Sequence, residues 1–576
     1  MRFEVWAPFP GQVDLLLDDR RIPMARDEQG WWSVEEDAAP GDRYGFSCDG
    51  GPLRPDPRAA HQPDGIGQPS AVYDHDAFVW HDERWGGLTL AGAVLYELHV
   101  GTFSRAGTFD GAIEQIAHLA ELGVDAVELL PVATASGQRG WGYDGVDLFA
   151  PHPAYGGPDG LKRFVDACHG AGIGVIIDVV YNHLGPAGCH LAELGPYFTD
   201  RHTTFWGDAI DYDGPHAAEV RRLVVDNARS WLRHFHGDGL RLDAVHAIVD
   251  DSARHVVAEL GEAVAELAEA LDRPLFVIAE SDLNDPVLVR PRPEGFGLDA
   301  AWADDWHHAV HAVLTGETTG YYEDFGSLDE LVKALEQAWV YDGAWSRHRN
   351  RPHGFPVDGL AADRFVVAVQ NHDQVGNRAA GERLASLTSW GRLHIAAAWL
   401  LTSPFVPMLF QGEEWGASTP FQYFTDHPDP DLARSVSEGR RREFAAFGWA
   451  PEAVPDPQAR ATFERSVLVW EEARRPPHEA LLRWHRDLIA LRRTLADLHD
   501  PAVTAAASHD EGLVVVARGS VQVVANLDAQ PRELGLPTGT RLLMASDPGV
   551  QVGVDGVRVP VDSVVLLRTP EEPAER

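Results

Sequence analysis

Cysteine is nearly absent from this chain, with 3 residues among 576. Cys48, Cys168 and Cys189 are too few and too scattered for a disulfide framework or a zinc site. Lysine is equally scarce, occurring only at positions 162 and 333, and the formal net charge is −40. So negative a charge argues against nucleic acid and anionic membranes as partners and suits a neutral substrate.

Long apolar runs are also missing, since none approaches the roughly 20 residues that span a membrane. The opening MRFEVWAPFP does not have the pattern of a secretory signal. Hydrophobic content of 44% and charged content of 24% are ordinary for a globular protein. We therefore expect a cytoplasmic protein without a membrane partner, and its length predicts several domains.

Three kinds of pattern divide the chain. Residues 1–88 alternate apolar and polar positions between Pro- and Gly-rich turns, which predicts an N-terminal β-sandwich. Residues 89–499 repeat strand, loop and helix, with an inserted aromatic loop region at about 182–215. Residues 500–576 again show short strands separated by Gly and Pro, which predicts a C-terminal β-sandwich.

The middle segment contains eight strand candidates with helices between them. This alternation predicts an α/β fold, a (β/α)8 TIM barrel. The candidates are 93–100, 126–131, 174–180, 239–243, 274–280, 298–306, 364–373 and 405–414.

Acidic side chains stand at the ends of three of these strands. Asp243 follows GLRL, Glu280 follows LFVIA, and Asp373 lies in QNHDQVGN. The carboxyl ends of barrel strands meet at one rim, so we expect the three carboxylates to converge there. Two facing carboxyl groups are the equipment of glycoside hydrolysis and lie roughly 5–5.5 Å apart in retaining enzymes.

Their surroundings suggest different roles. Arg241 shares a strand face with Asp243 and should keep it ionised, which suits a nucleophile. Glu280 emerges from an apolar strand near that charge, so its pKa should rise as a general acid requires. Asp373 and His372 would bind the hydroxyl groups of the sugar as its ring flattens.

These residues also have ordinary structural interpretations. Arg241 and Asp243 could form only an ion pair that closes a strand. Asp178, after the third strand, could cap it or support the site from behind. His183 and His372, taken singly, are typical of hydrogen-bonded structural histidines.

A rim of His and Asp side chains could also hold a metal. The first strand end offers only His99 and no H-x-H pair, which disfavours a metal-dependent hydrolase. We therefore expect neither a metal nor a cofactor. Tyr143 lies in GWGYDGVD, where its neighbouring glycines and tryptophan favour an exposed platform under a sugar ring.

Four motifs, in this order and each after the expected strand, resemble the α-amylase family of glycoside hydrolases. They are DVVYNH (178–183), GLRLDAVH (239–246), VIAE (277–280) and QNHD (370–373). The resemblance implies that Asp243 is the nucleophile, Glu280 the proton donor and Asp373 the stabiliser of the transition state. It also implies contacts to the sugar at the cleavage point from Tyr143, His183, Arg241 and His372.

The opening FEVWAP (3–8) is similar to the front domain of branching and debranching enzymes. Longer segments resemble family members that act on malto-oligosaccharides with a terminal trehalose: 96–104, 140–157, 203–215, 304–308 and 371–384. This resemblance implies hydrolysis, with retention, of the α-1,4 bond next to the trehalose unit. It also implies a set of residues that help to bind the substrate: Asp304, Asp305, Trp306, His308, Gln374 and Asn377.

One position departs from the broad family. Many members carry Lys-His after the nucleophile strand, whereas here His246 is three residues after Asp243 and Ala247 follows. Contacts to the leaving group, with His246 among them, should therefore differ from those of a starch-degrading amylase.

Two alternatives stay open: a transglycosylase of the glycogen branching type with the same nucleophile and acid, and a catalytically silent carbohydrate-binding barrel. The sequence carries no signal for an oligomeric state.

Overall fold

The computed structural model describes residues 1–204, 207–445, 450 and 453–570. Its centre is a closed barrel of eight strands, all paired in parallel, which confirms the predicted (β/α)8 fold. In chain order the barrel strands are β9 (Leu95–Leu98), β10 (Ala126–Leu129), β13 (Gly174–Val179), β16 (Gly239–Leu242), β17 (Phe276–Ala279), β18 (Ala300–Trp302), β21 (Phe365–Ala368) and β22 (Val406–Phe410).

Helices surround this barrel because each has one apolar face. In α4, Leu161, Phe164, Val165 and Cys168 share a helical face and are fully buried, as their spacing predicts. The α-helices are α1 (Val100–Phe103), α2 (Phe109–Ile113), α3 (Ile116–Leu122), α4 (Gly157–Gly170), α5 (Leu191–Leu194), α6 (Ala217–His234), α7 (Val256–Leu271), α8 (Asp304–Thr315), α9 (Leu328–Gln337), α10 (His372–Gly376), α11 (Trp390–Thr402), α12 (Pro430–Ala445), α13 (Arg460–Ser466), α14 (His478–Thr494) and α15 (Ala496–His499).

Some predicted boundaries are wrong. Strand β18 ends at Trp302, so the DDWHH cluster forms the first turns of α8 and does not end a strand. Likewise β21 ends at Ala368, and His372 and Asp373 belong to the short helix α10. In both places aspartate lies in the first turn of a helix, where the helix dipole favours it. The polar clusters stay near the strand ends because each helix starts within four residues of its strand.

The predicted insertion is more ordered than a loop. It contains α5 and an antiparallel hairpin of β14 (Phe198–Thr204) and β15 (Gly207–Ile210). Phe205 and Trp206, inside the 203–215 segment of the resemblance, lie outside the described residues, as do residues 571–576. Two further hairpins flank the barrel mouth: β11 (Ala133–Ala135) with β12 (Gly145–Pro151), and β19 (Asp342–Ser346) with β20 (Arg351–Gly354).

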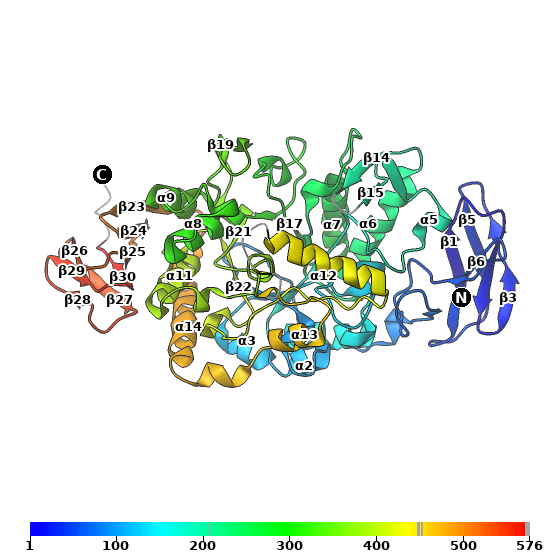
Figure 1. Ribbon diagram of the computed structural model, residues 1–576, viewed down its shortest axis with the longest axis horizontal. Helices are drawn as coiled ribbons and strands as arrows, with labels where there is room; N and C mark the ends of the chain where they lie inside the picture. The colour runs from blue at the N-terminus through cyan, green and yellow to red at the C-terminus, as the bar shows by residue number, and fades with distance from the viewer. Residues whose placement is uncertain (205–206, 446–449, 451–452, 571–576) are drawn as a thin grey trace.

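A β-sheet domain lies at either end of the barrel (Figure 1). The first has two sheets, with strand orders β1-β5-β4 and β3-β2-β6-β7, and β8 added to β6. Its strands are β1 (Arg2–Trp6), β2 (Val13–Leu17), β3 (Arg20–Pro23), β4 (Ala25–Arg26), β5 (Trp31–Glu35), β6 (Arg43–Cys48), β7 (Leu53–Arg54) and β8 (Ser70–Ala71). This agrees with the predicted front domain.

The C-terminal domain also has two sheets, with orders β23-β24-β25-β30-β27 and β26-β29-β28. Its strands are β23 (Ala506–Asp510), β24 (Leu513–Arg518), β25 (Val521–Asn526), β26 (Arg532–Gly535), β27 (Arg541–Ala545), β28 (Gln551–Val552), β29 (Gly556–Val559) and β30 (Ser563–Arg568). In the part of the chain that the structure describes, no helix is both long enough and apolar enough to cross a membrane.

The barrel interior has an apolar layer below a polar one. Side chains alternate along a strand, so residues two apart point the same way. The apolar layer comes first along the strands and includes Leu95, Ala126, Ile176, Phe276, Ile278, Ala300, Val366 and Val406. Two residues later, four strands present polar side chains that are almost fully buried: Glu97, Glu128, Asp178 and Arg241. This polar layer lies below the carboxyl ends of the strands.

Candidate active site

Asp243 and Glu280 follow two neighbouring strands, β16 and β17. Leu242 pairs with Ala279, so the register brings Asp243 and Glu280 side by side. The Glu280 amide donates to the Leu242 carbonyl at 2.9 Å, which continues the ladder past the strand end. Neighbouring strands are roughly 4.7–4.9 Å apart. The two acids therefore start one strand spacing from each other at the mouth of the barrel.

Arg241 connects these two carboxyl groups. Its Nη1 donates to Asp243 Oδ1 at 2.8 Å, and its Nη2 lies 3.7 Å from Glu280 Oε2. The guanidinium is held from behind by the ring of Trp302, 4.3 Å from its centroid. Asn182 Nδ2 donates to the other oxygen of Asp243 at 2.7 Å. Asp243 thus has a hydrogen bond on each oxygen, one of them from a cation, as an ionised nucleophile needs.

Glu280 has a different environment. Its Oε2 accepts a 2.5 Å hydrogen bond from the Ala244 amide. Burial raises the pKa of Glu280 well above its usual range; the charges of Asp243, Asp304 and Asp373 add to this, and Arg241 opposes it. A carboxyl group that stays protonated at neutral pH is equipped to act as a general acid.

The third acid, Asp373, lies in the first turn of α10. The Asn371 side chain caps this helix, accepting from the amides of Asp373 at 2.9 Å and Gln374 at 3.1 Å. The Asp373 carboxylate is exposed to the mouth and accepts from Asn377 Nδ2 at 2.7 Å. Gln374 Nε2 in turn donates to Asp304 Oδ1 at 3.0 Å, so this part of the predicted binding set is assembled.

Asp304 is an unusual acid because it lies close to other acids. Burial, followed by the charges of Asp373 and Asp305, raises its pKa to about 7. Near neutral pH it is therefore half protonated and can both donate to and accept from a hydroxyl group. This is useful in a sugar site, where each hydroxyl group is itself both a donor and an acceptor.

Tyr143 takes part in a buried chain of hydrogen bonds. Its hydroxyl donates to Asp178 Oδ2 at 2.7 Å and lies 2.8 Å from His372 Nε2. Both oxygens of Asp178 accept from Arg241 Nη1, at 3.0 and 2.8 Å. The Tyr143 ring stacks on His372 with centroids 5.2 Å apart and is half-buried, so it is less open than the predicted platform.

Glu97 is a site residue that the sequence analysis missed. Its Oε1 is 2.5 Å from His372 Nδ1, and its Oε2 accepts from the His372 amide at 2.8 Å. A signal was present in YELHV, because Glu97 alternates with Leu95 and must point into the barrel. An acid on the inward face of a buried strand needs a partner, and His372 is that partner.

Other predicted binding residues are less open. Asp305 is 4% exposed, and its Oδ2 accepts from Asn284 and from the amides of Val340 and Tyr341 at 2.7–2.8 Å. Trp306 is completely buried in the core. The structure gives both a supporting position: Asp305 fixes the segment at Val340 and Tyr341, and Trp306 packs in the core.

The three remaining histidines occupy different positions. His308 packs among aromatic rings, and burial lowers its pKa to about 3, so it is neutral. His246 is exposed, and its Nε2 lies 3.9 Å from Asp282 Oδ1. His183 is largely buried beside Asn182, and burial lowers its pKa. His183 is thereby linked to the nucleophile, whose carboxylate Asn182 also contacts.

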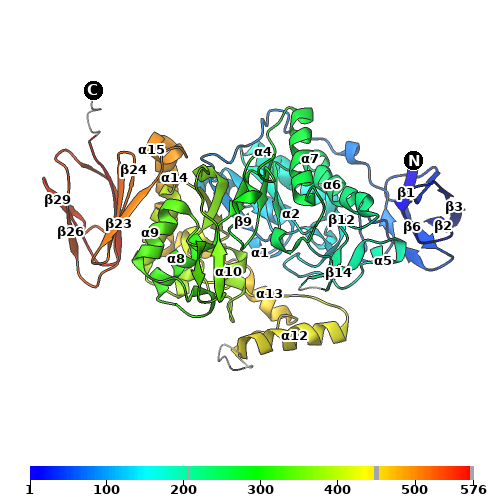
Figure 2. The same cartoon turned by 90° about the horizontal axis from the view of Figure 1, so that it is seen from above.

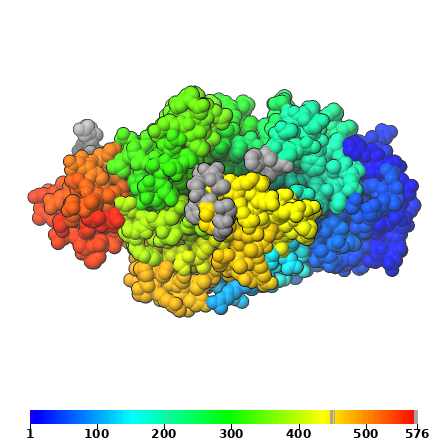
Figure 3. Space-filling view, viewed as in Figure 1, coloured from blue at the N-terminus to red at the C-terminus, as the bar shows by residue number. Residues whose placement is uncertain are grey.

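Helix α12 borders the site. Arg440 on this helix donates to the Gly376 carbonyl of α10 at 2.6 Å, which couples α12 to the motif that carries Asp373. Figure 2 shows α12 projecting from the barrel, and Figure 3 shows it in yellow in the middle of the face seen there.

One group of side chains has the spacing of a metal site among the residues that the structure describes. His202, Asp213 and Asp251 bring three ligand atoms within 4.8 Å of one another. Arg201 Nη2 already lies 2.5 Å from Asp213 Oδ1, which places a positive charge on that carboxylate. The predicted absence of a metal stays a prediction.

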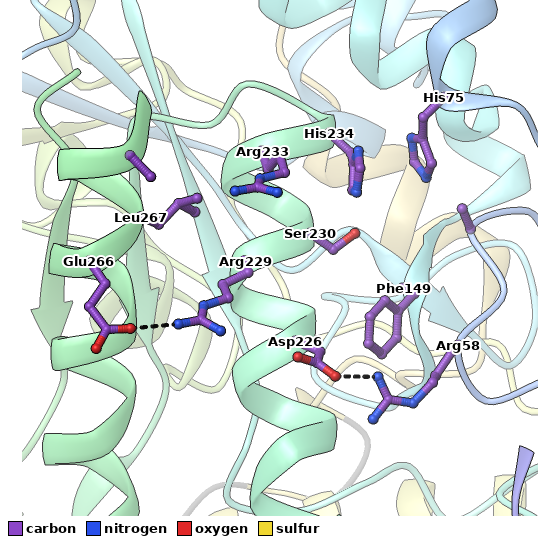
Figure 4. Close-up of a pocket in the computed structure, with 12 residues that line it drawn as sticks. Arg58, His75, Phe149, Asp226, Arg229, Ser230, Arg233, His234, Glu266 and Leu267 are labelled. Atoms are coloured by element: carbon purple, nitrogen blue, oxygen red, sulfur yellow. Dashed lines mark hydrogen bonds and ion pairs between the residues drawn. The ribbon is translucent and has the colours of Figure 1, made fainter. Parts of the chain in front are cut away.

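A cavity of about 630 Å³ opens away from these acids. It lies between α6, α7 and the segment that carries Arg58 and His75 (Figure 4). Arg58 pairs with Asp226 at 2.7 Å, and Arg229 pairs with Glu266 at 2.8 Å. None of the three acids at the barrel mouth lines this cavity, so it is separate from the candidate active site.

Comparison with known proteins places this geometry in a family. A family model for the alpha amylase catalytic domain matches residues 73–193. The chain is 50% identical to malto-oligosyltrehalose trehalohydrolase from Arthrobacter ramosus, over 98% of this chain and 99% of that protein. It belongs to the malto-oligosyltrehalose trehalohydrolase family. The predicted resemblance to the α-amylase family is thereby confirmed.

Two other matches cover most of the chain. Malto-oligosyltrehalose trehalohydrolase from Saccharolobus solfataricus is 43% identical over 85% of each chain. A crystal structure from Salmonella typhimurium, assigned to the alpha amylases, is 38% identical with a TM-score of 0.90 and covers 99% of this chain and 97% of that one. The barrel with its two flanking domains is therefore shared along nearly the whole length.

Proposed function

We propose that the chain hydrolyses, with retention, the α-1,4-glucosidic bond next to the terminal trehalose unit of a malto-oligosyltrehalose and releases trehalose. The observation that carries this proposal is that Asp243 and Glu280 both lie beside the Arg241 guanidinium in different surroundings. Asp243 receives its hydrogen bond, as a nucleophile needs, and burial raises the pKa of Glu280, as a proton donor needs. The relatives' common name supplies the substrate.

The reaction needs two steps. In the first, Glu280 gives its proton to the glycosidic oxygen while a carboxylate oxygen of Asp243 attacks the anomeric carbon, so trehalose leaves and a glycosyl-enzyme forms. In the second, the Glu280 carboxylate takes a proton from water, and the water oxygen attacks the anomeric carbon. The bond to Asp243 breaks, and both acids return to their first state.

The remaining residues would bind the sugar. Asp373, oriented by Asn377, would stabilise the positive charge that develops on the ring in the transition state. We propose that the following residues contact the substrate: Tyr143, His183, Arg241, His246, Asp304, His308, His372, Gln374 and Asn377. Asp305 and Trp306 would support this set from the positions described above.

The domains that we propose are 1–88, 89–499 and 500–576.

Products distinguish this function from its rivals. Incubation with maltopentaosyl-trehalose should release free trehalose, and the other product should first form as the α-anomer. New α-1,6 branches on amylose would favour the transglycosylase instead. Binding of glucan without turnover, on this substrate and on other α-glucans, would favour a silent barrel.

A further inference from the structure

Hydrogen bonds join the side chains of Glu97, His372, Tyr143 and Asp178 in a row, and their partners show which atoms carry a proton. Asp178 is buried with both oxygens on the Arg241 guanidinium, so it accepts hydrogen bonds. Burial raises its pKa to about 6, which still leaves it ionised at pH 7 and above. A tyrosine hydroxyl has a single proton. Tyr143 uses this proton on Asp178 and must accept from its other neighbour, His372 Nε2.

The second ring nitrogen of His372, Nδ1, also donates a hydrogen bond. Glu97 is 1% exposed and accepts the His372 amide proton on Oε2, with Oε1 at 2.5 Å from Nδ1. A carboxylate in this position accepts a proton from Nδ1. Both ring nitrogens of His372 then donate, and an imidazole donates from both only as the imidazolium cation.

We propose that Glu97 is a positioning residue that keeps His372 doubly protonated through turnover, so that its Nε2–H always donates to the Tyr143 hydroxyl beside the sugar site. Glu97 then balances the charge of His372. Arg241 is shared between Asp178 and Asp243, and Asp243 lies where the oxocarbenium ion develops.

Several other groups face this pair. The titratable or charged groups around His372 are Tyr143, Asp178, Arg241 and Asp373, and His99 lies nearby. Burial lowers the pKa of His372, but the charge and hydrogen bond of Glu97 outweigh it and raise the pKa above its usual value.

Glu128 provides a matched control. It is the register partner of Glu97 on β10 and equally buried. Burial, followed by the charge of Glu97, raises the pKa of Glu128 well above its usual range, and its Oε2 has no hydrogen-bond partner. Glu128 is therefore neutral, and a glutamine in its place would change no charge.

The proton between His372 Nδ1 and Glu97 can be observed directly by ¹H NMR. In the intact protein, a proton held between His372 Nδ1 and Glu97 should give a ¹H NMR resonance far downfield of the amides at pH 7. Glu97→Gln and His372→Gln should each abolish this resonance, and Glu128→Gln should keep it. A wild-type spectrum without such a resonance, or its survival in Glu97→Gln, would overturn the proposal.

Kinetics then test its role, and here the proposal rests on the proposed function. Glu97→Gln should lower kcat/KM for maltopentaosyl-trehalose at pH 8, by about tenfold for each unit by which the pKa of His372 falls. The deficit should shrink as the pH falls, because protonation of His372 then depends less on Glu97. Glu97→Asp should recover part of the activity, and Glu128→Gln should keep the wild-type profile.

The outcomes separate the two proposals. A loss of equal size at every pH would mean that Glu97 acts only in packing and would contradict the positioning role. If the wild-type protein releases no trehalose, the proposed function fails, but the NMR resonance still decides whether Glu97 holds a proton against His372 Nδ1.

Discussion

At the scale of single residues, burial and hydrogen bonding sort the acids of the barrel mouth. Asp243 receives hydrogen bonds from Arg241 and Asn182, while Glu280 receives one amide and only a distant guanidinium nitrogen. Arg241 contacts both acids, but only Asp243 receives a hydrogen bond from it. Burial then keeps the proton on Glu280.

The first prediction concerns the nucleophile. Asp243→Asn keeps the shape of the side chain but cannot form the glycosyl-enzyme, so kcat should fall on the order of 10⁴-fold or more. Glucan binding should persist, which isothermal titration would show. A variant that turned over at the wild-type rate would remove Asp243 from the mechanism.

The second prediction concerns the acid and its pH dependence. Since Glu280 works in its protonated form, activity should fall as the pH rises through its raised pKa. Glu280→Gln should cost roughly 10²–10⁴-fold and lose this alkaline limb. A substrate with a good leaving group should recover much of the rate in the first step. No recovery on such a substrate would count against Glu280 as the proton donor.

At the scale of elements, the short helix η8 (Glu413–Trp415) after β22 contains a buried acid. Glu413 is 7% exposed and accepts from the Phe410 amide at 3.2 Å. Burial is the main cause that raises its pKa to about 8. The stabilisation linked to its proton is present below the unfolded pKa of 4.5 and is lost as the pH rises through 8.

The third prediction follows from this loss of stability with rising pH. Glu413→Gln removes the need to ionise a buried acid, so the loss of unfolding free energy between pH 6 and pH 9 should be smaller than in the wild type. Each pKa unit corresponds to about 1.4 kcal/mol. Urea midpoints at the two pH values measure the difference. Glu471→Gln, at an exposed side chain, is the control and should behave like the wild type. Equal pH dependence in Glu413→Gln and the wild type would refute the raised pKa.

Elements also explain which site residues the sequence revealed. Asp243 and Glu280 could be predicted because each directly follows a buried apolar strand. Asp305 and Trp306 belong to the same DDWHH cluster as Asp304, but the helical geometry of α8 turns them inwards. A cluster in sequence spreads around a helix, so only some of its members can face the substrate.

At the scale of the whole molecule, Arg518 attaches the C-terminal domain to the barrel. This residue of β24 donates to five backbone carbonyls at 2.7–3.2 Å: those of Thr402, Ser403, Leu498, Asp500 and Val503. Thr402 ends α11 and Leu498 lies in α15, so one guanidinium joins the sheet to two barrel elements. Arg492 contributes from α14 and donates to the same Ser403 carbonyl at 2.6 Å.

The fourth prediction tests this joint. Arg518→Leu would remove the hydrogen bonds to these five carbonyls, of which Ser403 keeps the one from Arg492, and should cost about 3 kcal/mol or more. The C-terminal sheets should then unfold separately from the barrel, as a second transition in calorimetry. Arg532→Leu removes an exposed ion pair of the same domain and should leave a single transition. A single, unshifted transition in Arg518→Leu would show that other contacts attach the domain.

The sequence by itself determined the barrel, its flanking β-domains and three acids at strand ends. The apolar pattern of each strand, and the order of strands and helices, can both be recognised along the chain without knowing any contact. Only the tertiary structure decided the partners. Glu97 reaches His372 across 275 positions of the chain, and Arg241 contacts acids from two neighbouring strands. Protonation follows from such contacts and from burial, which depend on closing the barrel and exist in no single segment.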